Sequence, residues 1–150
     1  GPAELVAGVL RLTGEKLIHN PKLQRDAGQL TVMGQALVNP PSVEGWHEGI
    51  EWIDSGSLVE RVNYASEQFA DVGKPGIRAM VDGLGAGEGS NAPEDLVQAA
   101  LDQMGAFSVS GDTRAALVEF AGHVNGDTDS RQRGAELLRL VAATPDFQKE

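Results

Sequence analysis

The sequence contains no cysteine and no apolar run approaching the roughly 20 residues that a membrane-spanning helix requires. Without cysteine, disulfides, thiolate metal ligands and cysteine nucleophiles are all excluded. Positive charge is scarce, because 12 Lys and Arg face 22 Asp and Glu and leave a net charge of −10. We therefore expect no nucleic-acid binding, which needs clustered positive charge, and no membrane insertion. The 150 residues are enough for one domain whose core needs no cross-links.

Apolar residues recur at intervals of three and four along most of the chain, which is the spacing of amphipathic helices. This spacing predicts helices over about 3–18, around Leu30–Leu37, from Ser57 to Phe69, from Pro75 to Val81, around Leu96–Met104, around Ala116–Val124 and over about 130–143. The pattern Ser57-x-x-Glu60 is a capping box, which would begin the third of these helices. Each helix is too short to be stable alone, so each must pack on its neighbours. The prediction is an all-α fold, a compact bundle of six to seven short helices in a single domain over residues 1–150.

Two segments interrupt the predicted helices. Residues from about 39 to 56 predict one long ordered loop, and the glycine-rich stretch over about 83–92 predicts a flexible connector inside the domain. The glycines do not match a nucleotide-binding loop, because a helix precedes them and their spacing is not G-x-G-x-x-G. Gly1-Pro2 is typical of the pair left when a protease removes an expression tag, so we expect this chain to be a piece of a longer protein.

One acidic stretch partly fits a calcium-binding loop. Oxygen-bearing side chains occupy the first, third, fifth and twelfth positions of that template, namely Asn125, Asp127, Asp129 and Glu136. The sixth position is Ser130 instead of the glycine that forms the turn, and Arg131 and Arg133 place positive charges inside the site. We interpret the stretch as an acidic loop that caps the last helix, and we expect no metal and no cofactor.

The predicted loop holds both tryptophans of the chain, Trp46 and Trp52, with His47 between them. Loops of this length are uncommon in compact domains unless they are ordered for a purpose. The favoured interpretation is structural, with the two indoles pinning the loop. The second is a contact surface for a protein partner, because tryptophan is enriched at binding hot spots. The third is a mixed nitrogen–oxygen metal site of His47 with Glu44, Glu48, Glu51 and Asp54, although a single histidine does little to define its geometry.

Arg61 and Asn63 follow the loop on the third predicted helix. We hypothesise that Arg61 pairs with Asp54 or Glu51 and so holds the loop in place. The candidate partner-binding residues are accordingly Trp46, His47, Trp52, Asp54, Arg61 and Asn63. No catalytic residue is predicted, because the chain has no G-x-S-x-G nucleophile elbow and its other histidines lie near predicted helix ends.

Four motifs resemble the C-terminal part of a large bacterial family called domain of unknown function 1800. They are Leu5-Val-x-Gly-Val-Leu-Arg, Met33-Gly-Gln-Ala-Leu-x-Asn-Pro-Pro-Ser-Val-x-Gly-Trp46, Trp52-Ile-x-Ser-x-x-Leu-x-x-Arg61-x-Asn63-Tyr-Ala and Arg139-Leu-Val-x-Ala-x-Pro-x-Phe-Gln148. The second motif is long and unusual, and together they span nearly the whole chain. The stretch His47–Glu51 departs from the pattern, because many relatives look shorter there.

The resemblance implies a longer, exported bacterial protein at the periplasm or cell surface, with an export signal outside this chain. It implies no reaction and no catalytic residues, because the family has no established activity. We expect a non-enzymatic helical module that supports assembly or binds a protein partner, or the remainder of the native chain, through the loop of Trp46 and Trp52. The alternative is one wall of the active or metal site of a larger enzyme, using His47, Glu51 and Asp54.

Overall fold

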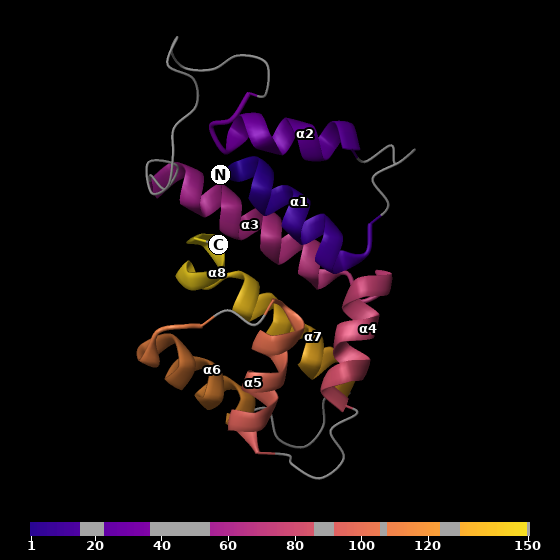
Figure 1. The fold of residues 1–150 in the computed structure, drawn as a ribbon, viewed down its shortest axis with the longest axis vertical. Helices are drawn as coiled ribbons and strands as arrows, with labels where there is room; N and C mark the ends of the chain where they lie inside the picture. Colours follow the sequence, from indigo (N-terminus) through magenta and orange to yellow (C-terminus); the bar gives the residue numbers. More distant parts are fainter. Residues whose placement is uncertain (16–22, 37–54, 86–91, 106–107, 124–129, 150) are drawn as a thin grey trace.

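The computed structural model describes residues 1–15, 23–36, 55–85, 92–105, 108–123 and 130–149. Within these ranges the chain forms eight helices and no strand, which confirms the all-α prediction (Figure 1). The helices are α1 (Pro2–Thr13), α2 (Leu23–Val32), α3 (Ser55–Ala70), α4 (Pro75–Gly85), α5 (Pro93–Gln103), α6 (Gly111–His123), α7 (Ser130–Ala142) and α8 (Pro145–Lys149). None of these helices is long and apolar enough to cross a membrane.

Helices α3 and α7 form the centre of the bundle. Helix α3 packs on α1, α2 and α8 as well as on α7, and α7 packs in addition on α4, α5, α6 and α8. In Figure 1, α1 and α2 lie on one side of α3, whereas α5 and α6 lie at the opposite end of the molecule. One continuous cluster of buried hydrophobic residues takes members from every helix, so each helix gains its stability from shared packing.

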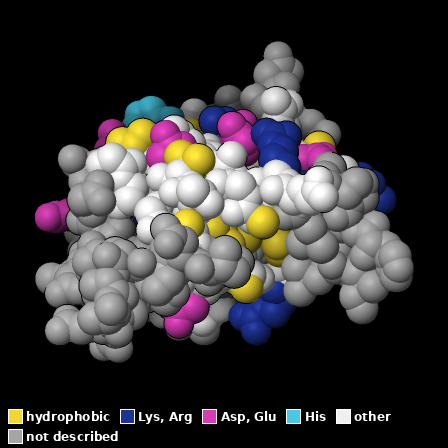
Figure 2. All heavy atoms as spheres, turned by 90° about the horizontal axis from the view of Figure 1, so that it is seen from above, with side chains coloured by type: hydrophobic (Ala, Val, Ile, Leu, Met, Phe, Trp, Pro, Cys, Tyr) yellow, Lys and Arg dark blue, Asp and Glu magenta, His cyan; other side chains and the backbone are white. Residues whose placement is uncertain are grey.

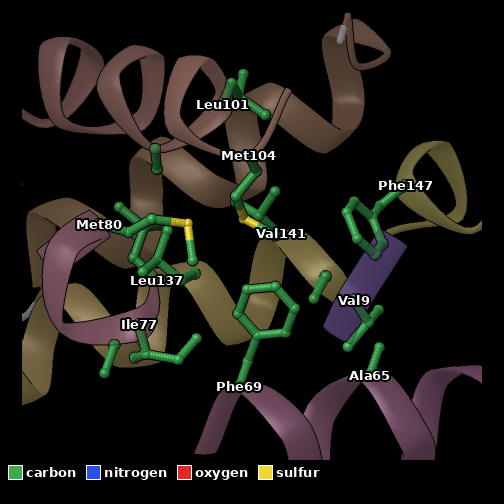
Figure 3. Packing of buried hydrophobic residues seen from close by; sticks show 14 of the residues in the cluster. Val9, Ala65, Phe69, Ile77, Met80, Leu101, Met104, Leu137, Val141 and Phe147 are labelled. Atoms are coloured by element: carbon green, nitrogen blue, oxygen red, sulfur yellow. The ribbon is translucent and has the colours of Figure 1, made fainter. Parts of the chain in front are cut away.

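Aromatic and aliphatic side chains fill the centre of this cluster (Figure 3). Phe69 of α3 points into the cluster, and Ile77, Met80 and Leu137 lie on one side of its ring (Figure 3). Its ring also meets Phe147 of α8 edge to face, with centroids 6.3 Å apart and planes at 88°. This geometry is favourable for aromatic pairs and joins the short C-terminal helix to α3.

The end of α1 and the start of α4 approach each other at the level of the backbone. Helix α1 ends at Thr13, earlier than the predicted residue 18, because Gly14 takes a left-handed conformation with φ of 72° and closes the helix. A Cβ atom on Gly76 would lie 1.9 Å from the carbonyl oxygen of Leu12, so only glycine fits at that position. The buried Lys74 lies beside this contact and pairs with Glu15 at 3.2 Å.

The third helix differs from its prediction in start and in orientation. Helix α3 already includes Ser55, so Ser57 lies inside the helix and is buried. The expected capping box of Ser57 and Glu60 therefore does not begin the helix. Ala65 and Phe69 are buried as predicted, but Leu58 and Val62 are only half-buried. Arg61 and Tyr64 are buried in their place, because α3 is covered by α1, α2, α7 and α8 and not by a single neighbour.

Two other boundaries and one helix also differ. Residues 83–85, expected to begin a flexible connector, form the last turn of α4, where Gly83 faces the side chain of Gln103. Helix α2 begins and ends earlier than expected, and Gly34, with φ of 93°, follows it. Helix α8 was not predicted, because its 5 residues are too few to show a helical repeat. The segment 39–54 and residues 86–91 lie outside the described residues.

Candidate functional site

Most of the predicted site residues lie outside the described part of the chain. These are Trp46, His47, Trp52 and Asp54, together with Glu51. Arg61 and Asn63 are described, and both lie on α3. Their side chains point in different directions, because residues two apart on a helix do not share a face. The Arg61 side chain is buried with 4% of its surface exposed, whereas Asn63 is exposed. The structure therefore does not bring these two residues together.

Arg61 connects three helices from inside the protein. Its Nη2 donates a hydrogen bond to the backbone carbonyl of Gln148 in α8. Burial lowers the pKa of Arg61, and the carboxylate of Glu4 in α1 raises it. The Nε and Nη1 atoms of Arg61 are buried and have no hydrogen-bond partner among the described residues. A buried guanidinium with unused donors is a strong candidate to receive a carboxylate.

The pairing of Arg61 with Asp54 stays a prediction, and a double-mutant cycle tests it. We expect Arg61→Met and Asp54→Asn to be coupled by at least about 1 kcal/mol in urea unfolding, because each change removes the other's partner. Repeating the cycle with Glu51→Gln distinguishes the two proposed carboxylates. Asp102→Asn, an exposed change on α5, should be additive with Arg61→Met. Additivity in both test cycles would remove the proposed pairing.

A groove lined by described residues lies where the end of α3, helix α4 and helix α7 meet. It has a volume of about 570 Å³. Phe69, Val81 and Ala135 form its buried apolar floor, and Val72 at its edge has 53% of its surface exposed. Hydrophobic side chains also reach the surface in the hollowed centre of the face in Figure 2. Much of that face belongs to residues outside the described ranges. The candidate site is therefore the groove at which α3, α4 and α7 meet, the α3–α4–α7 groove.

Charged side chains surround the α3–α4–α7 groove, three arginines against two carboxylates, for a net charge of +1. Arg131 pairs with Asp82 at 3.6 Å across the two helices. Arg139 pairs with Glu136 at 3.7 Å and donates from Nε to Ser66 Oγ at 2.6 Å. Arg78 donates to the carbonyl of Gly73 at 3.4 Å. Among the described residues, no group of three or more His, Asp and Glu side chains could hold a metal ion.

A second hollow of about 360 Å³ adjoins the groove and shares Ala70 and Arg139 with it. Asn63 lines this hollow, and so does Tyr64, whose side chain is otherwise buried. Burial raises the pKa of Tyr64, and the neighbouring carboxylates of Asp26 and Glu15 raise it further. Tyr64 therefore stays neutral to a higher pH than an exposed tyrosine.

Folding should become less stable as the pH rises above 10.0, the ordinary pKa of the tyrosine phenol. The pKa of Tyr64 is higher in the folded than in the unfolded chain, so its contribution is complete below pH 10.0 and is lost as the unfolded phenol ionises. Urea unfolding of wild type and Tyr64→Phe across this range measures the effect, and the phenylalanine variant should lack this part of the decline. Because the chain has a single tyrosine, the rise in near-ultraviolet absorbance that accompanies phenolate formation reports the ionisation of Tyr64 alone. A native-state midpoint at 10.0 would contradict this expectation.

Sequence reasoning missed the arginines of the groove. Arg131 was considered only as a charge that spoils a calcium loop, and Arg78 and Arg139 were assigned no role in binding. The one signal in the sequence was the separation of Arg131 and Arg139 by two helical turns, which places both on one side of α7. Nothing in the sequence showed that Arg78, more than 50 residues earlier, lies across from them.

Together these features define an all-α protein that presents a charged surface groove between three helices. The family model described as "Protein of unknown function (DUF1800)" matches residues 1–149. The chain belongs to this family, which confirms the resemblance carried by its motifs. Comparison with curated proteins and with solved structures gave no match.

Proposed function

We propose that this chain is a non-enzymatic helical module of an exported bacterial protein and that it binds a protein partner at the α3–α4–α7 groove. The observation that supports this proposal is the composition of the groove, an apolar floor with arginines around it. An apolar centre, a polar edge and an enrichment in arginine are typical of protein interfaces. The loop of Trp46 and Trp52 is a second proposed contact, based on its sequence.

Site-specific crosslinking in the native bacterium tests this function. A photoreactive amino acid is placed at Gln132, an exposed groove residue, in the full-length protein. Gln98, exposed on α5 away from the groove, is the matched control. We expect a protein adduct from Gln132 and none from Gln98. If Gln132 gives no adduct, the groove is not the binding surface, and the same experiment at Trp46 tests the loop.

Two measurements on the full-length protein separate this function from the enzymatic alternative and test export. Stoichiometric metal that is lost in a His47→Ala variant would favour an active or metal site of His47, Glu51 and Asp54 over a non-enzymatic module. Fractionation of the bacterium should find the full-length protein in the periplasm or at the cell surface. Its recovery from the cytoplasm alone would contradict the proposed export.

A further inference from the structure

We propose that the occupant of the α3–α4–α7 groove is an acidic segment of a partner protein, with at least one apolar side chain between its carboxylates. This inference rests on the proposed binding function and adds the chemistry of the partner. Three features of the groove carry it, namely its charge, the solvent exposure of its arginine ion pairs and its exposed apolar edge.

The charge of the groove is opposite to that of the chain. The whole chain carries a net charge of −10, whereas the groove carries +1. An acidic segment is repelled by most of an acidic surface. Its carboxylates therefore have their most favourable electrostatic interaction at a locally positive groove. The same distribution disfavours nucleic acid, whose long phosphate backbone would also meet the acidic remainder of the protein.

The arginines of the groove can accept new carboxylates. Arg78 makes no ion pair within the described residues, and its hydrogen bond to Gly73 is long at 3.4 Å. The pairs of Arg131 with Asp82 and of Arg139 with Glu136 are exposed, with separations of 3.6 and 3.7 Å. Exposed ion pairs of this kind contribute little, so an incoming carboxylate can replace either acid. The planar guanidinium also favours a carboxylate through two parallel hydrogen bonds.

The apolar part of the groove has a buried floor and an exposed edge. Val72 is one of only a few large hydrophobic side chains exposed in the described part of the chain, and it borders the groove with Ala70. Arg131 and Arg139 are separated by about 12 Å along α7, since a helix rises about 1.5 Å per residue. Two carboxylates at that separation leave room for an apolar side chain between them, opposite Ala135 in the floor of the groove.

Fluorescence anisotropy of the whole chain with labelled peptides tests this assignment. The probes are a peptide rich in Glu and Leu and two matched peptides in which Gln or Lys replaces Glu. We expect the Glu peptide to bind most tightly and its affinity to fall with salt. Arg78→Glu with Arg139→Glu should weaken it at least about tenfold. The control pair, Arg11→Glu with Arg114→Glu, carries the same change in net charge outside the groove. It should weaken binding of the Glu peptide by less than a third of the factor seen for the groove pair.

Circular dichroism establishes that each variant is folded. If the groove variant is unfolded, NMR chemical-shift changes of the wild-type backbone amides on addition of the Glu peptide supply the test. These changes should fall on α4 and α7. Equal weakening by both variant pairs, shifts elsewhere, or equal binding of the Gln or Lys peptide would overturn the proposal. So would retention of Glu-peptide binding when groove arginines are lost, or preferential binding to vesicles of anionic lipid. A partner crosslinked through Gln132 without affinity for the Glu peptide would leave the binding function standing and overturn only this assignment.

Discussion

Replacing Gly76 with alanine is expected to lower the free energy of unfolding by at least about 3 kcal/mol. The added Cβ would lie 1.9 Å from the carbonyl oxygen of Leu12 and 2.5 Å from the carbonyl carbon of Thr13. Both atoms belong to the backbone, so no side-chain rotation can relieve the clash. The end of α1 must separate from the start of α4, and the buried pair of Lys74 with Glu15 lies beside that contact. Urea unfolding measures the loss.

Gly8→Ala is the matched control for this prediction. Gly8 lies in the middle of α1, and a Cβ there would meet nothing within 4 Å. Alanine in a helix interior should raise the stability by about 0.5–1 kcal/mol. Similar stabilities for Gly76→Ala and the wild type would show that α1 and α4 do not approach as closely as described.

Truncating Phe69 to alanine is expected to lower the free energy of unfolding by about 3–5 kcal/mol. The side chain is fully buried in the core cluster, so its removal loses apolar contacts and leaves a cavity. Part of the loss comes from the edge-to-face contact with Phe147. A cycle of Phe69→Leu with Phe147→Leu should give a coupling of about 0.5–1.5 kcal/mol for that contact.

Phe120 supplies the comparison for Phe69. It lies on α6, is half-buried and packs against the edge of the core. Phe120→Ala should therefore lose clearly less stability than Phe69→Ala. Equal losses, or additive effects of the two leucine substitutions, would show that Phe69 is not the central side chain of the core or that α8 does not pack on it.

Helix positions were predictable because the apolar repeat reflects which side of each segment is buried. The ends of the helices were less predictable. Glycine ends α1 at Gly14 but lies within α4 at Gly83, and only the surrounding structure decides between these two outcomes. The buried side of α3 escaped prediction for a similar reason. Arg61 has a polar head that normally faces solvent, but it is buried here because four helices cover α3, and one of its donors meets the carbonyl of Gln148 in α8.

The residues of the candidate site were only partly predictable from sequence patterns. Asn63 and Arg61 were grouped because they are close in the chain, but the helix places them on different sides. The groove joins Arg78 with Arg131 and Arg139, and such a grouping exists only once α4 packs against α7. A local motif cannot report a site whose members come from separate helices. The predicted loop of Trp46 and Trp52 stays a prediction.

The unequal packing of the helices also implies unequal local stability. Helix α7 packs on α3, α4, α5, α6 and α8, so the hydrogen-bonded amides on its buried side should exchange with solvent only when the whole domain unfolds. Helix α2 packs chiefly on α1 and α3 and can open while the rest stays folded. The arginines of α7 therefore stand on the most persistent element of the protein, whereas the hollow of Asn63 has one wall that opens early. A partner held by α7 would meet a surface that is already formed before it arrives.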